Sequence, residues 1–117
     1  MEVTGFIYKP LAVVRFTPEE IAVMVRCSRC HYDGKCKDLS VQGGLLHGWT
    51  NLLAWRAEKE SNEPLEEVLE FGKLDTLCKV VEFPPPDVEK IGRELHKKIY
   101  DVLTSLNAEY THLNPPT

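Results

Sequence analysis

The chain has 117 residues, which is enough for one domain (residues 1–117) with a single modest core. Its composition, with 43% apolar and 27% charged residues, is typical of a globular protein, and its net charge of -4 argues against a dedicated DNA or RNA binder. No apolar run reaches the roughly twenty residues of a membrane span, and the N-terminus does not resemble a signal peptide. We therefore expect a cytoplasmic protein, off the membrane, with reduced cysteines.

The N-terminal region predicts β-structure. Two β-rich runs, VTGFIY and LAVVRF, lie on either side of Lys9-Pro10. A proline cannot donate a hydrogen bond to a strand ladder, so this pattern allows two strands or one strand that the proline interrupts.

A helix is predicted directly after the second run, at RFTPEE. Thr17 suits the N-cap, Pro18 the first helical position, and Glu20 the reciprocal position of a capping box. The Asp33-Gly34 pair is a turn signal, so we expect the helix to end there.

The last part of this helix reads CSRCHYDGKC, and its cysteines raise the question of a metal site. Cys27, Cys30, His31 and Cys36 supply zinc-type ligands, with Cys78 in reserve. However, structural zinc sites usually place a C-x-x-C pair in a turn, whereas the capping box puts Cys27 and Cys30 in the third and fourth turns of a helix. We interpret the cysteines as small core hydrophobes, with no metal or other cofactor, and keep a zinc-stabilised module as the alternative.

Two further cysteine chemistries fit the pattern less well. Cys27 to His31 matches the C-x-x-C-H signature of haem attachment, which would require export and a second axial ligand. A thioredoxin-like pair would sit at the start of a helix, and these cysteines lie near the end of theirs.

The segment GGLLHGWTNLLAWRAEK predicts a second helix. We expect it to begin after Gly43-Gly44, or as late as Thr50 because Gly48 weakens the first turns. At about 100° per residue one face collects leucines and a tryptophan. Its members are Leu45, Leu46, Trp49, Leu52 and Leu53.

The second half of the chain predicts a strand that runs into a helix at LEFGKLD, and then a long terminal helix after FPPPD, with Asp87 as a plausible N-cap. Apolar residues recur at helical spacing along that last segment. They are Val88, Ile91, Leu95, Ile99, Val102, Leu106 and Tyr110. Such a helix would extend roughly 33 Å, followed by a frayed tail from about residue 111.

These elements predict an α+β domain in which two or three short strands pack against three or four helices. The amphipathic C-terminal helix is long enough to extend past its own core, so we expect a homo-oligomer.

Polar and aromatic side chains gather around three glycines between the first two helices, and the free N–H groups of a helix start could bind a ligand there. Histidine, amide and indole groups suit stacking and hydrogen bonding to a planar, nucleotide-like ligand. The alternative is that the Gly-Gly pair merely turns the chain and Trp55 packs against the last helix. The candidate ligand-binding residues are Tyr32, Lys35, Gly43, Gly44, His47, Asn51 and Trp55.

The stretches HYDGKC, GGLLHGWTN and LEFGKLDTLCKVVE resemble small, uncharacterised bacteriophage or prophage proteins. The resemblance implies a small intracellular accessory protein, for example one with anti-defence activity that occupies a host protein or sequesters a signalling nucleotide. It carries no catalytic residue over to this chain.

We therefore expect a non-enzymatic binding protein whose partner is another protein or a small nucleotide-like ligand. A zinc-stabilised module is the alternative. A small enzyme that uses His31 or His47 as an acid–base group is the third hypothesis.

Overall fold

The structure, a computed structural model, describes most of the chain: residues 1–7, 11–34, 40–60 and 63–113. Within these ranges it describes the side chains at all positions except 4–7, 40–42 and 107–113.

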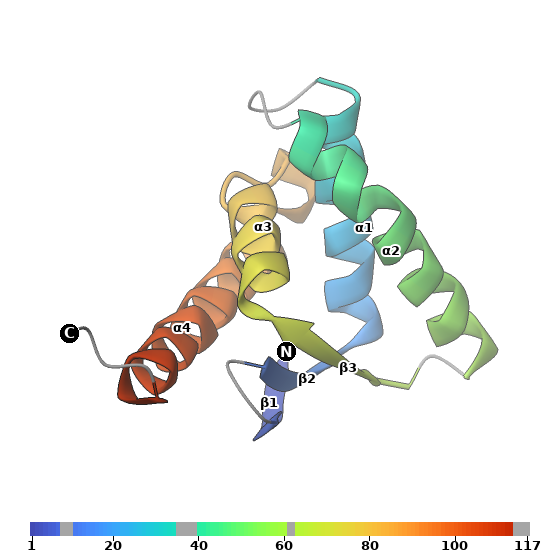
Figure 1. The fold of residues 1–117 in the computed structure, drawn as a ribbon. Coiled ribbons are helices and arrows are strands. Elements are labelled where there is room, and N and C mark those ends of the chain that lie inside the picture. Colours follow the sequence, from blue (N-terminus) through green and yellow to red (C-terminus); the bar gives the residue numbers. More distant parts are fainter. Residues whose placement is uncertain (8–10, 35–39, 61–62, 114–117) are drawn as a thin grey trace.

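A three-stranded antiparallel sheet forms the base of the molecule (Figure 1). Its strands are β1 (Glu2–Ile7), β2 (Leu11–Phe16) and β3 (Leu65–Glu70), in the spatial order β1-β2-β3. The sequence had allowed one strand or two before residue 17, and the structure has two, paired as a hairpin with Glu2 opposite Arg15.

The sheet has one buried face. Ala12, Val14 and Phe16 of β2 are fully buried, as are Leu65 and Leu69 of β3, while the residues between them are more exposed. Because alternate residues of a strand point to opposite faces, this period of two turns one apolar face toward the helices. Helices α1 and α3 leave the sheet on the same side (Figure 1).

Helix α1 (Pro18–Tyr32) begins where the sequence predicts. The Thr17 side chain accepts a hydrogen bond from the Glu20 N–H, and the Glu20 carboxylate accepts one from the Thr17 N–H, so both halves of the capping box are present. The helix ends at Asp33, followed by Gly34 with φ 71°, a left-handed conformation that favours glycine.

Helix α2 (Ser40–Lys59) begins earlier than predicted. Gly43 and Gly44 lie inside its first turns rather than before it, so the predicted starts after Gly44 or at Thr50 are wrong. The physical reason is tertiary: a contact with α1 requires glycine at position 43, as described below.

Helix α3 (Phe71–Val81) follows β3 without a linker, which confirms the predicted strand-to-helix unit. A 3₁₀ turn (Pro86–Val88) then leads into helix α4 (Glu89–Leu113). The predicted N-cap Asp87 therefore lies within the 3₁₀ turn, and the terminal helix extends to Leu113.

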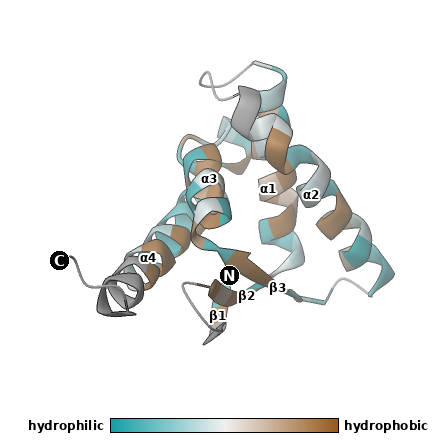
Figure 2. Ribbon diagram, viewed as in Figure 1, coloured by the Kyte–Doolittle hydropathy of each residue, from teal (hydrophilic) through white to brown (hydrophobic). Residues whose placement is uncertain are grey.

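The fold is α+β, as predicted: within the described residues a three-stranded sheet packs with four α-helices, the last of them long and amphipathic. Hydrophobic and hydrophilic residues alternate along the helices (Figure 2). The predicted stripe of α4 is buried at Leu95, Ile99, Val102 and Leu106, which join residues of the sheet, α1 and α3 in one core. In the described part of the chain, no helix combines the length and hydropathy that a bilayer crossing requires.

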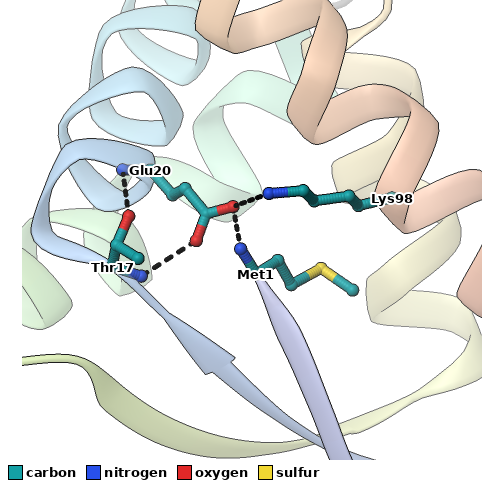
Figure 3. A network of polar contacts seen from close by, with 4 residues as sticks. All are labelled: Met1, Thr17, Glu20 and Lys98. Carbon is teal, nitrogen blue, oxygen red and sulfur yellow. Dashed lines mark hydrogen bonds and ion pairs between the residues drawn. The ribbon is translucent and has the colours of Figure 1, made fainter.

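Glu20 connects three elements through one buried carboxylate (Figure 3). Besides completing the cap of α1, it pairs with the amino group of Met1 and lies 3.6 Å from the Nζ of Lys98 on α4. Burial raises the pKa of Glu20. Hydrogen bonds from Met1 and Thr17 and the charges of Met1 and Lys98 outweigh that effect, so its pKa lies below the usual value.

We expect the ionised Glu20 to stabilise the fold in a pH-dependent way. Because its folded pKa is lowered, the stabilisation is fully present above the unfolded pKa of about 4.5 and is lost as the pH falls through the folded pKa. Urea denaturation of wild type and Glu20→Gln between pH 3 and pH 7 measures this. Glutamine keeps the capping box but not the charge, so we expect the variant to be less stable only near neutral pH.

The neighbouring Glu19 is exposed and provides the control, because Glu19→Gln removes the same charge from the same helical turn. A pH-independent difference between wild type and Glu20→Gln would contradict the prediction.

Candidate functional site

Helices α1 and α2 pack against each other at Gly43. A Cβ added there would lie 2.7 Å from the Ser28 carbonyl oxygen and 2.7 Å from the Tyr32 backbone nitrogen, closer than real Cβ atoms approach. Gly44 is tight as well, but there the nearest atom belongs to the Tyr32 ring, at 3.3 Å. The Gly-Gly pair therefore serves helix packing, and its N–H groups do not form a free helix start.

A buried polar contact lies one to two turns further along the same helix pair. The hydroxyl oxygens of Ser28 and Thr50 lie 3.1 Å apart. Each hydroxyl group is also within hydrogen-bond distance of a backbone carbonyl oxygen of its own helix. Both residues are fully buried. The contact satisfies two buried polar groups and fixes the rotation of α2 against α1.

The structure brings three of the predicted ligand-binding residues together. The rings of Tyr32 and His47 stack with centroids 5.5 Å apart and planes 4° from parallel. Asn51 lies one turn further along α2 and donates to the His47 carbonyl oxygen at 2.8 Å. The two rings cover each other, so a planar ligand could stack only on an outer face, and Tyr32 and Asn51 are exposed.

The other predicted ligand residues do not join this group. Trp55 is exposed and has the Lys59 amino group 4.8 Å from its ring centroid. Gly43 and Gly44 pack against α1, so they do not contribute to a ligand site. Lys35 lies outside the described residues.

The cysteines of α1 face the interior. Cys27 and Cys78 are free, buried thiols, whereas the buried Cys30 is disulfide-bonded. The predicted reduced state therefore does not hold at Cys30. Burial, with a smaller contribution from Asp87, raises the pKa of Cys27 to about 12 against the opposing charge of Arg26, so this thiol stays protonated at neutral pH.

The predicted zinc ligands have contacts that compete with metal binding. Zinc binds the thiolate, which the raised pKa of Cys27 disfavours, and a disulfide sulfur is not a thiolate. The Nε2 atom of the buried His31 lies 2.8 Å from the Val80 carbonyl oxygen and so connects α1 to α3. No group of three potential metal ligands is found among the residues that the structure describes, and Cys36 is not one of those residues.

A groove of about 620 Å³ lies between α3 and α4, away from the predicted ligand residues. Phe71, Cys78 and Leu103 contribute apolar surface, and His96 and Tyr100, with ring centroids 6.4 Å apart, form one wall. The remaining lining residues are polar or charged: Asp75, Lys79, Glu82 and Thr104.

The charges around the groove favour a cationic occupant. Asp75 pairs with Lys79 at 3.2 Å, whereas Glu82 forms no ion pair among the described residues. Burial first, and then the charges of Asp75 and Glu82, raise the pKa of the Cys78 thiol to about 11, with Lys79 acting in the opposite direction. Two carboxylates and one lysine line the groove, and this excess of negative side chains disfavours a phosphate group.

Sequence reasoning missed this groove because its walls come from two helices, α3 and α4, whose relative packing no local pattern specifies. One local signal was present: His96 and Tyr100 stand at i and i+4 on the last helix, outside its apolar stripe. Aromatic residues at that spacing on an otherwise polar face indicate a second surface.

Comparisons of the chain with protein-family models, with curated proteins and with solved structures found no match.

We expect Gly43→Ala to destabilise the protein by about 2–4 kcal/mol, because the added methyl group meets backbone atoms that cannot rotate away. Gly44→Ala should cost less, since the Tyr32 ring can shift. Gly48→Ala provides the matched control: no described atom outside the helix backbone lies within 4 Å of its Cβ position, so helix propensity should stabilise that variant by up to about 1 kcal/mol.

Urea denaturation of the three variants measures these differences. Equal stability of Gly43→Ala and wild type would mean that α2 does not pack on α1 in this way.

We expect the Cys27 and Cys78 thiols of the native protein to react slowly with iodoacetamide at pH 8, because burial keeps both protonated and leaves Cys27 inaccessible and little of Cys78 exposed in the groove. Denaturation should make both reactive, which mass spectrometry of the alkylated peptides detects. A Glu58→Cys variant, with its cysteine on an exposed turn of α2, is the positive control. Rapid labelling of native Cys27 would show an available thiolate and would support the zinc alternative.

Proposed function

We propose that this chain is a non-enzymatic binding protein that recognises a segment of another protein through the groove between α3 and α4. The observation that carries the proposal is the combination of aromatic and apolar surface with a carboxylate, Glu82, that forms no ion pair with any described residue. Phe71 of α3 and Tyr100 of α4 are exposed large hydrophobic residues that line the groove, and Glu82 lines it as well.

This combination suits a short segment with apolar side chains and a lysine or arginine. Aromatic rings bind both apolar groups and cations, and a carboxylate nearby adds a charge-assisted hydrogen bond. An enzyme would need an activated nucleophile or base in the groove. Among the groove residues, Cys78 has a raised thiol pKa, which disfavours its use as a nucleophile.

The choice between a partner protein and a nucleotide-like ligand follows from the same charges. Asp75 and Glu82 repel phosphate, and the alternative surface at Tyr32, His47 and Asn51 is an exposed ring stack rather than the start of a helix. The protein-binding hypothesis is therefore the better supported of the two.

We place this activity in the cytoplasm, of a bacterial host if the chain is phage-encoded. The resemblance to bacteriophage proteins implies an accessory role such as anti-defence activity, by occupying a host protein or by sequestering a nucleotide, and a peptide-binding groove suits the first of these. Cys27 and Cys78 are thiols, as expected in a reducing compartment, whereas the disulfide at Cys30 is unusual there.

Titration of the ¹⁵N-labelled protein with the acetylated peptide amides Leu-Arg-Leu-Arg and Leu-Glu-Leu-Glu, and with AMP, tests the proposal. We expect the arginine peptide alone to shift the amide signals of Phe71, Cys78 and Tyr100. Glu82→Gln should weaken its binding about three- to fivefold, the effect of one partly exposed ion pair.

Glu58→Gln makes the same change in net charge on α2, away from the groove, and should leave the affinity unchanged. If AMP instead shifts the signals of Tyr32, His47 and Asn51, and the arginine peptide shifts nothing in the groove, the nucleotide hypothesis replaces the present one.

A further inference from the structure

Helix α2 has a second apolar surface in addition to its buried one. Leu46, Leu53 and Ala57 face the core, but Leu45 and Leu52, predicted to share their face, are 71% and 53% exposed. Trp55 is also 53% exposed. The sequence prediction of a single leucine face was therefore incomplete, since α2 is apolar on two sides.

The exposed residues form a continuous stripe, which we define as Leu45, Gly48, Leu52 and Trp55. Their spacings of 3, 4 and 3 are those of the a and d positions of a heptad, and at about 100° per residue they fall within roughly 80° of one another. In Figure 1, α2 lies at the outer edge of the molecule with α1 beside it. The stripe thus presents a coiled-coil-like seam that no described element of the chain covers.

From this seam we infer that two copies of the chain associate through their α2 helices, packed antiparallel about a twofold axis at the level of residue 50. In that register Leu52 of each copy faces Gly48 of the other, and Trp55 faces Leu45. The proposal is independent of the α3–α4 groove, which lies on other helices.

The shape of the stripe fits its own copy. No described atom outside the helix backbone lies within 4 Å of the Cβ position of Gly48, so the space above this glycine is open. Glycine lets two helices approach closely, and the leucine that faces it in the antiparallel register fills that space. The larger Trp55 faces the strongly exposed Leu45, so that each end of the seam pairs one aromatic with one aliphatic side chain.

The charge of the stripe also fits self-association. From Leu39 to Trp55 the sequence contains no Asp, Glu, Lys or Arg. A twofold axis brings identical surfaces together, and like charges that face each other across it would repel. A charged neighbour of the stripe is Lys59, next to Trp55 at its end, and in the antiparallel register the two copies of Lys59 lie at opposite ends of the seam. A partner recognised by charge would need a complementary surface that this stripe lacks, which favours a second copy over an acidic or basic ligand.

Sedimentation equilibrium of the full chain from 5 to 300 µM tests the inference. We expect a reversible monomer–dimer equilibrium, because three large side chains per copy make a small interface with modest affinity. Gly48→Leu should raise the dimer dissociation constant at least tenfold, since the new side chain occupies the space that Leu52 of the second copy requires. It should not unfold the monomer, because nothing described lies near that position.

Gly72→Leu is the matched control. Gly72 on α3 is also exposed and equally open, so the same substitution there should leave the dissociation constant unchanged. Leu52→Glu provides a second disruption of the seam by introducing a charge.

The inference is overturned if wild type is monomeric at 300 µM. If that monomer binds neutral phosphatidylcholine vesicles through Trp55, lipid and not a second copy is the occupant of the stripe. It is also overturned if an oligomer persists unchanged in both Gly48→Leu and Leu52→Glu, because the interface would then lie elsewhere.

Discussion

The contact of Gly43 with the backbone of α1 determines how most of the surface is used. Because glycine is required there, α2 packs directly on α1, and the Ser28–Thr50 hydroxyl pair fixes its rotation. That rotation sends Leu46 and Leu53 into the core and leaves the alternate leucines in solvent. One close approach between two helices thus decides both what the core contains and which apolar residues remain for another molecule.

The same contact explains why Gly43-Gly44 is a misleading signal. A Gly-Gly pair before a leucine-rich stretch is typical of a turn and a helix start, and local propensity makes it a poor helix interior. Here the cost of two helical glycines is offset by burial of α1 against α2, a tertiary effect that no local pattern contains. The candidate ligand site depended on the interpretation of Gly43-Gly44 as a helix start. Of its predicted residues, the structure brings together only Tyr32, His47 and Asn51.

Elements with local signals were predictable. The capping box at Thr17 and Glu20, the stop at Asp33-Gly34, the transition from β3 to α3 and the stripe of α4 all lie within a few residues of the sequence that specifies them. The α3–α4 groove was not predictable, because each of its two walls has the sequence pattern of an ordinary helix face. Only the packing of α3 beside α4 forms the groove. The interpretation of Cys27 as core filler holds for the same local reason, since the capping box fixed its helical turn.

The two proposed surfaces follow from different physical features, and this difference bears on how the molecule would work. The groove combines aromatic side chains with the Glu82 carboxylate, for which the described part of the chain supplies no ion-pair partner, so it suits a partner with a specific charge pattern. The α2 stripe has no charge and a twofold-compatible spacing, so it suits a copy of itself. The groove residues belong to α3 and α4 and the stripe to α2, and no residue is shared. A dimer through α2 would therefore carry two grooves, and a partner that offers two suitable segments would bind more tightly than either segment alone.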